Sequence, residues 1–188
     1  DIKYLAGDAI PRTVTDGVVN VWLAPVASFT WGYTDANGSG TPDAGEQIRF
    51  TDTSGNGPTS WSWDFGDGAI STAQNPTHSY NVAKTYTVRL TASNPTGSNS
   101  RSQTISIQPN CVNSVVVSPN PASVKAGSSV TFTAIGYDAY GNPIAGIAWT
   151  WEVTNPSAGT VNPTTGQFTA GSTLGSYANA VKASGTYK

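Results

Sequence analysis

The sequence lacks most of the residues that metal clusters, catalytic triads and charged binding surfaces are built from. It has no methionine, one cysteine and one histidine, and charged residues make up 11% of it, against roughly 25% in ordinary soluble domains. The 9 Lys and Arg do not cluster and do not outnumber the 11 Asp and Glu. Nucleic-acid binding, which needs a positive surface, is therefore excluded. The apolar runs all fall well short of the roughly 20 residues of a membrane-spanning helix.

The scarcity of histidine and cysteine also excludes the common catalytic arrangements that depend on them. A single histidine cannot build a metal cluster or a triad without suitable partners, so His78 is expected to be structural. The lone Cys111 cannot form an internal disulfide, and we expect it to lie in a linker without a chemical role. Because the chain begins at Asp1 rather than at a methionine, we expect a processed start. The composition and the motifs described below favour an extracellular or cell-surface protein. The sequence predicts a protein that is not an enzyme.

Short strand patterns separated by turn residues take the place of charge and helical periodicity. Stretches of Thr, Val and aromatic residues recur every 8–12 residues, with Gly, Pro, Asn and Asp between them, which is typical of β-sandwiches. The fold class is therefore all-β, with two tandem Ig-like sandwiches and an N-terminal extension that carries an unpaired strand. We expect the extension at residues 1–24, the first sandwich at 25–108, a linker at 109–113 and the second sandwich at 114–188.

The first sandwich carries a distinctive aromatic and acidic motif. Residues 61–68 read Trp-Ser-Trp-Asp-Phe-Gly-Asp-Gly, with related segments before them at 50–54 and after them at 75–80 and 86–94. This pattern resembles PKD domains, Ig-like sandwiches found in many surface proteins and secreted enzymes. One departure is Lys84, where the family usually has Gly. The resemblance covers residues 25–108 and implies that the motif's aspartates form turns.

The spacing within this motif predicts the roles of its members. Trp61 and Trp63 are two residues apart and so share one face of a strand. At least one of them is expected in the core, since indole burial is strongly favourable. Asp64 and Asp67 are expected to accept backbone N–H bonds in a tight turn. These four residues form the predicted structural motif, and a catalytic carboxylate pair is the disfavoured alternative.

A twelve-residue acidic loop in the same domain has the spacing of a calcium loop. Glycine stands at loop position six, and oxygen-bearing residues stand at the positions that ligate calcium in EF-hands. The expected ligands are Asp35, Asn37, Ser39, Thr41 (through its carbonyl), Asp43 and Glu46. No helices are expected on either side, so this is a calcium loop within a β-domain and the ion would be a structural cofactor. An ordinary solvated turn and a glycosylation acceptor at Asn37 are the alternatives.

The second half resembles bacterial Ig-like (Big) domains. The resemblance is carried by residues 114–127, 130–144, 149–153 and 159–170. In that family a strand such as Tyr177–Ser184 is followed by one more strand, whereas here the chain stops at Lys188. The resemblance therefore implies an open sheet edge. The predicted acceptor edge is Tyr177, Asn179, Val181 and Ala183.

The N-terminal extension offers a strand that suits such an edge. Asp16-Gly17 predicts a turn, followed by a strand without a partner from Val18 to Leu23. Val19, Val21 and Leu23 point one way along it, and Val18, Asn20 and Trp22 point the other. The predicted assembly residues are Val18, Val19, Val21, Trp22 and Leu23. Donation of this strand to a neighbouring copy would build a homopolymeric surface filament, with glycans or other surface proteins as further candidate partners.

Three alternatives to this filament remain open at the level of sequence. The chain is a slice of a longer tandem-repeat protein, or residues 18–23 close its own second sandwich. The third alternative is that the chain is an accessory binding or spacer module of a secreted hydrolase or of a tandem-repeat adhesin.

Overall fold

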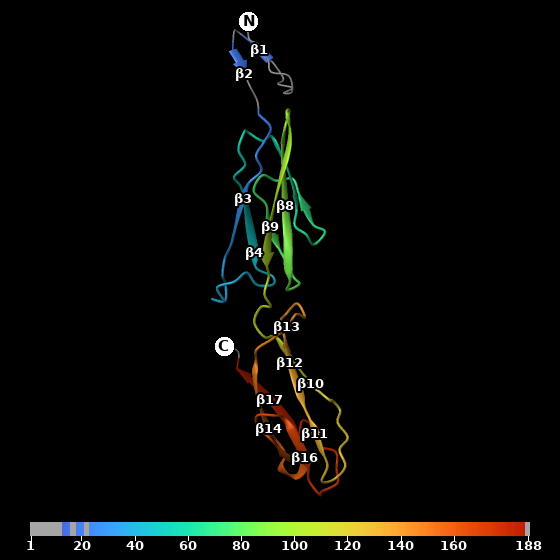
Figure 1. The fold of residues 1–188 in the computed structure, drawn as a ribbon. Coiled ribbons are helices and arrows are strands. Elements are labelled where there is room, and N and C mark those ends of the chain that lie inside the picture. Colours follow the sequence, from blue (N-terminus) through green and yellow to red (C-terminus); the bar gives the residue numbers. More distant parts are fainter. Residues whose placement is uncertain (1–12, 16–17, 21–22, 187–188) are drawn as a thin grey trace. The chain divides into compact units, whose positions relative to one another are not determined.

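The computed structural model describes residues 13–15, 18–20 and 23–186 (Figure 1). The chain divides into two compact units, residues 1–108 and residues 109–188. The described residues form β-strands and turns, with one short 3-10 helix at Pro156–Ala158 and no α-helix among them. The fold is all-β, as the sequence predicts, with two Ig-like sandwiches in series.

Two antiparallel sheets face each other in the first unit. One has the order β3-β4-β7, and the other has the order β6-β5-β8-β9. Their bounds are Phe29–Tyr33 (β3), Gln47–Asp52 (β4), Ser60–Asp64 (β5), Ile70–Ser71 (β6), Thr77–Ser79 (β7), Thr85–Asn94 (β8) and Gly97–Ser106 (β9). The longest pairing joins β8 and β9, with Thr85 opposite Ser106 and Asn94 opposite Gly97.

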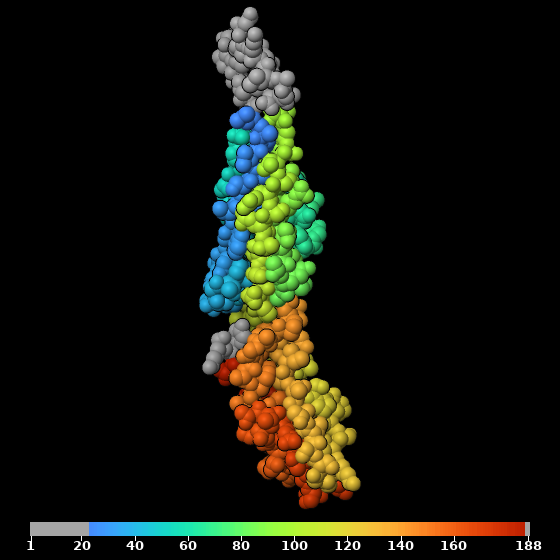
Figure 2. Space-filling model, in the orientation of Figure 1, coloured from blue at the N-terminus to red at the C-terminus, as the bar shows by residue number. Residues whose placement is uncertain are grey.

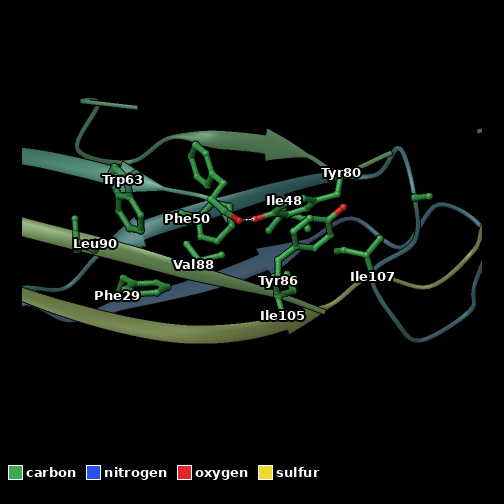
Figure 3. Packing of buried hydrophobic residues seen from close by; sticks show 12 residues of the cluster. Phe29, Ile48, Phe50, Trp63, Tyr80, Tyr86, Val88, Leu90, Ile105 and Ile107 are labelled. Carbon is green, nitrogen blue, oxygen red and sulfur yellow. Dashed lines mark hydrogen bonds between the residues drawn. The ribbon is translucent and has the colours of Figure 1, made fainter. Parts of the chain in front are cut away.

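The core of the first unit is closed and aromatic (Figure 3). Alternate residues of β8 point into it, so that Val88 and Leu90 are buried while Thr87 and Arg89 are exposed. Trp63 is completely buried and its indole N–H donates to the carbonyl of Ala73 at 2.9 Å. The full cluster is Phe29, Ala44, Ile48, Phe50, Trp63, Phe65, Tyr80, Tyr86, Val88, Leu90, Ile105 and Ile107. Such a core fixes the loops at its ends.

Three small sheets make up the second unit. Their orders are β10-β12-β13, β11-β16-β15 and β14-β17. The bounds are Ser114–Ser118 (β10), Ser129–Thr131 (β11), Thr133–Tyr137 (β12), Pro143–Ile144 (β13), Ala148–Val153 (β14), Gly159–Val161 (β15), Gln167–Ala170 (β16) and Val181–Thr186 (β17). The backbone N–H of Asn113 donates to Tyr137 at 2.8 Å, so the segment expected as a linker joins this unit.

The core of the second unit is thinner than that of the first. Trp151 and Phe168 are buried, and Phe132 lies 6.3 Å and 6.1 Å from their ring centroids but stays half-exposed. Val117 on β10 and Val181 on β17 are likewise only half-buried. The side of this sandwich between those two strands is open.

The expectation of an unpaired N-terminal strand is wrong. Val18–Asn20 (β2) pairs antiparallel with Thr13–Thr15 (β1), with Val14 opposite Val19. The physical reason is that a two-residue Asp-Gly turn favours a hairpin, and the Thr-Val-Thr run before the turn has high β-propensity. The predicted assembly residues Val21 and Trp22 lie outside the described residues.

Candidate functional site

The aspartates of the motif at residues 61–68 hold a turn. The Asp64 carboxylate accepts the Gly66 N–H at 2.9 Å, and the Asp67 carboxylate accepts the Ala69 N–H at 3.0 Å. Gly66 has φ 81°, and a Cβ there would lie 2.6 Å from the carbonyl oxygen of Thr87. Only glycine fits both the conformation and the space. The two carboxylates therefore both accept hydrogen bonds from the backbone of the turn, as the sequence predicts.

His78 belongs to the same structural cluster. Its Nε2 lies 2.7 Å from Asp67 Oδ2, and its ring stacks on Phe65 with centroids 4.3 Å apart. Burial alone would raise the pKa of Asp67, but the hydrogen bonds from Ala69 and His78 outweigh it and lower the pKa below its ordinary value. Within the motif, the half-buried Trp61 on β5 donates its indole N–H to Asp52 at 2.8 Å. These contacts tie the motif to the sheet opposite.

Four of the six predicted calcium ligands contact one another in the loop between β3 and β4. The Asn37 amide donates to Asp43 at 2.7 Å, Ser39 Oγ donates to the Thr41 carbonyl at 2.9 Å, and Thr41 Oγ1 donates to Asp43 at 3.3 Å. These contacts are hydrogen bonds, and in the first of them the amide nitrogen of Asn37 faces the Asp43 carboxylate. The loop thus brings four of the predicted ligand residues together.

The other two predicted ligands hold the loop's backbone. Asp35 accepts N–H bonds from Gly38 at 2.8 Å, Ser39 at 3.0 Å and Gly40 at 2.9 Å. The Gly40 bond, ahead of the other backbone bonds, lowers the pKa of Asp35 despite partial desolvation. Glu46 accepts from the N–H of Ala36 at 2.9 Å. It also accepts from the N–H of Asp43 at 3.0 Å, so it bridges the two ends of the loop.

The carboxylates of this loop lie in an unusual environment. Asp43 is 2% exposed and Glu46 is 7% exposed. The salt bridges among the described residues are His78–Asp67 and Lys182–Glu152, so neither buried carboxylate has a basic side chain beside it. Desolvation and the negative charges of Asp35, Glu46 and Asp43 raise the pKa of Tyr33. The donor set suits a hard cation, although the described residues contain no group of three or more His, Cys, Asp or Glu arranged around one point.

The predicted acceptor edge is only partly a strand. Val181 and Ala183 lie on β17, which pairs with β14 from Val153–Val181 to Ala148–Thr186. Tyr177 and Asn179 precede the strand, and Asn179 has φ 53°, which interrupts an extended chain. The expected strand from Tyr177 therefore begins four residues later. Within the described residues β17 pairs on one side only.

Of the predicted assembly residues, Val18 and Val19 lie in the β1–β2 hairpin and Leu23 follows it. Leu23 is 61% exposed, and its carbonyl accepts from the Asn94 amide at 2.8 Å. This bond ties the end of the extension to the first sandwich.

Sequence reasoning missed a buried polar turn in the second unit. Asp138 is 2% exposed, and its carboxylate accepts four hydrogen bonds from Asn110, Tyr140 and Asn142. The available signal was the Asp-x-x-Gly-Asn spacing, which is typical of a side chain that caps its own turn.

Comparison with known families agrees with this division of the chain. Residues 24–109 match the PKD domain, and residues 111–177 match the bacterial Ig-like domain (group 2). The chain joins a PKD domain to a bacterial Ig-like domain. No helix in the described part of the chain is long and apolar enough to cross a membrane.

One curated relative is a collagenase. Collagenase ColA of Bacillus cereus is 40% identical over 72 residues, which are 36% of this chain and 8% of the collagenase. The chain thus matches a small part of that protein's length.

Two solved PKD domains are similar to the first unit. The PKD1 domain of Vibrio anguillarum Epp is 28% identical, covering 47% of this chain and 99% of that domain, with a TM-score of 0.40. The PKD1 domain of the Vibrio cholerae metalloprotease PrtV is 32% identical, covering 46% and 99%, with a TM-score of 0.39. At these TM-scores the likeness adds nothing to the fold described above.

Proposed function

We propose that this chain is a non-catalytic extracellular spacer module of a larger secreted or surface protein. The observation that carries the proposal is the PKD domain followed by a bacterial Ig-like domain, together with a collagenase relative of which the matched segment is a small part. The motif carboxylates accept hydrogen bonds from turn backbone, which supports a structural role for them.

A spacer role is favoured over polysaccharide binding by the composition of the surface. Proteins grip sugar rings with exposed aromatic side chains. Among the large apolar residues that are exposed in the described ranges, Tyr140 is the only aromatic one. The described ranges therefore offer one largely exposed ring where a binding platform needs a row of them.

The test is retention of the purified 188-residue chain on insoluble chitin, cellulose and collagen, with assay of released products. A spacer passes through all three without retention and releases no sugar or peptide. Retention on one of them would replace the spacer role by a binding role, and product release would contradict the non-catalytic assignment.

We further propose that the loop at residues 35–46 binds calcium and stiffens the PKD domain. Two buried carboxylates without a basic partner, and four candidate ligands already in contact, support this. An ion that binds only the folded state stabilises it by about 2.7 kcal/mol at a hundred times its dissociation constant. For a domain of this size, that raises the melting temperature by about 10 °C or more.

The calcium test compares melting in calcium and in EDTA. Asp35→Asn is expected to remove the difference, whereas Asp64→Asn, which changes an aspartate in another turn of the same domain, is the matched control and keeps it. A second readout is Tyr33, because calcium neutralises the carboxylates that raise its pKa, and the pKa should fall. Identical melting curves in calcium and EDTA would refute the site.

We also propose, as a second function, that copies of this chain assemble head to tail. The specific observation in favour is that β10 and β17 each pair on one side only within the described residues. Free strand edges pair with strands of other chains. Electron microscopy and light scattering of the 188-residue chain test this, and a monodisperse monomer at high concentration would refute it.

A further inference from the structure

The first unit has a shallow hollow on the outer face of its smaller sheet, β3-β4-β7. The hollow has a volume of about 470 Å³, and sites for small ligands span roughly 300–1,000 Å³. Core residues alternate with exposed ones along β3 and β4, so the hollow lies on the face of the sheet that points away from the aromatic core. In Figure 2 the blue residues of β3 lie at the surface along one side of this unit, next to the green residues of β8 and β9.

Gly32 keeps the middle of this hollow open. It lies directly opposite Arg49 on β4, and Arg49 lies opposite Thr77 on β7, so the three residues form one row across the sheet. The φ of Gly32 is not in the left-handed region, and a Cβ there would meet no atom within 4 Å. Neither the backbone nor the packing therefore requires glycine. A glycine inside a strand weakens the strand and often marks a place where a ligand approaches the backbone.

Arg49 is the one charged residue in the described lining of the hollow. Its side chain is exposed, and it takes part in neither of the two salt bridges of the described residues. Thr30 and Thr51 face each other in the next row of the same face, and Gln47 lies on the other side of Arg49. These hydroxyl and amide groups can both donate and accept hydrogen bonds. The lining therefore favours a ligand that carries an anionic group and several hydroxyls.

The acidic side chains nearest to the hollow lie toward its Tyr33 end. Desolvation and the negative charges of Asp35, Glu46 and Asp43 raise the pKa of Tyr33, which lines the hollow there. An anionic group is repelled from that end and attracted by Arg49. The charge distribution thus places the anionic group of a ligand over the row from Gly32 to Thr77.

The polar lining also distinguishes between classes of partner. Stable protein interfaces have a largely apolar centre, whereas the aromatic side chains of this lining, Trp31 and Tyr33, are half-buried and pack against the core. A sugar ring carries hydroxyls on its rim, and a carboxylate on the ring matches the two parallel N–H groups of an arginine. Because charge and hydrogen bonds hold such a sugar, it does not require the row of aromatic rings that a neutral polysaccharide needs.

We propose that the outer face of the β3-β4-β7 sheet binds a saccharide unit that carries a carboxylate, as in the uronic acid units of acidic polysaccharides. Arg49 pairs with the carboxylate, Gly32 leaves room for the ring, and Thr51 and Thr77 contact its hydroxyls. This goes beyond the spacer role, because it attaches the module to an acidic matrix.

The test is a titration of the 188-residue chain with trigalacturonate, followed by amide chemical shifts. The buffer contains EDTA, so that no calcium ion can bridge the sugar to the loop at residues 35–46. We expect saturable shifts confined to residues 30–34, 47–51 and 77. Maltotriose, a neutral trisaccharide with the same type of linkage, should cause none.

The site offers two variants and a matched control. Arg49→Gln should weaken binding about tenfold or more, because it removes a charge-assisted pair. Gly32→Val should abolish binding by filling the hollow, and it should keep the melting temperature because its Cβ meets no atom and valine favours strands. Arg101→Gln removes an exposed arginine on β9, outside the lining, and should leave binding unchanged.

Each contrary outcome has a defined meaning. Absence of shifts on this face, or binding that survives both Arg49→Gln and Gly32→Val, overturns the site. Equal weakening by Arg101→Gln overturns it too, since general charge attraction then accounts for the binding. Equal binding of maltotriose overturns the role of the carboxylate, and equal binding of hexaglutamate overturns the saccharide as partner. The spacer proposal is tested separately, on chitin, cellulose and collagen.

Discussion

Replacing Asp138 by Asn should unfold the second unit at a markedly lower urea concentration. The carboxylate accepts the Tyr140 and Asn142 backbone N–H groups on Oδ1, each at 2.9 Å. On Oδ2 it accepts the Asn142 amide at 2.8 Å and the Asn110 N–H at 3.1 Å. An asparagine keeps one acceptor oxygen but turns an NH₂ group toward two donors. Hydrogen bonds to a charged group are worth about 1.5–3 kcal/mol each, so losing two costs about 3 kcal/mol or more.

This loss depends on pH in a defined direction. Burial alone would raise the pKa of Asp138, but the hydrogen bonds from Asn142, Asn110 and Tyr140 outweigh it and hold the pKa below its ordinary 3.8. A carboxylate with a lowered pKa stabilises the fold above its unfolded value, and this stabilisation is lost as pH falls through the folded value. The difference in free energy of unfolding between wild type and Asp138→Asn should therefore have its full value at pH 7 and decrease below pH 3.8.

The assay is urea unfolding followed by amide exchange in residues 109–186. Asp64→Asn in the first unit is the control, since that carboxylate lies in an exposed turn. Equal urea midpoints for wild type and Asp138→Asn at pH 7 would refute the reasoning. A difference between the two urea midpoints that grows as the solution is acidified would also refute the reasoning.

Two further predictions concern the PKD domain. Gly66→Ala should destabilise it by about 2–4 kcal/mol, because φ is 81° and the new Cβ meets the Thr87 carbonyl at 2.6 Å. Gly68→Ala, with φ 97° but no atom within 4 Å of its Cβ, should cost only about 1 kcal/mol, and equal urea midpoints for the two variants would contradict the clash. Tyr80→Phe should cost about 1–2 kcal/mol in urea unfolding, since the buried hydroxyl donates to the Phe65 carbonyl at 2.9 Å and its removal leaves that oxygen unpaired. An unchanged midpoint would show that water replaces this bond.

The sequence predicted best where side-chain alternation was regular. The alternation in β8 placed Val88 and Leu90 in the core, and the shared parity of Trp61 and Trp63 placed both rings on the core side. The alternation of side chains along the strand did not predict how deeply each of the two rings is buried. Trp63 is fully buried, whereas Trp61 is half-exposed and packs against the cluster from outside. That difference depends on the opposite sheet, which is distant in sequence.

The misses have local physical causes. The Asp-Gly pair predicted a turn, but the Thr13–Thr15 run before it was overlooked as a partner of Val18–Asn20, although such a sequence favours a hairpin. The strand expected from Tyr177 begins at Val181, because Asn179 adopts a positive φ that no alternation pattern reveals. The burial of Asp43 and Asp138 was not foreseen, since aspartates are usually exposed and their burial depends on backbone donors that only the fold brings near.

Edge strands normally carry charges that discourage indiscriminate pairing, and β17 shows how the second unit meets that requirement while keeping a usable edge. Its charged residue, Lys182, pairs with Glu152 on the neighbouring strand at 3.0 Å, and both side chains are largely exposed. Val181 and Ala183, on the opposite face of β17, are half-buried. A strand that pairs with β17 thus meets charged side chains on one face and half-buried apolar side chains on the other. A strand that carries a charge on that second face would bury the charge without a partner, so this edge disfavours such strands.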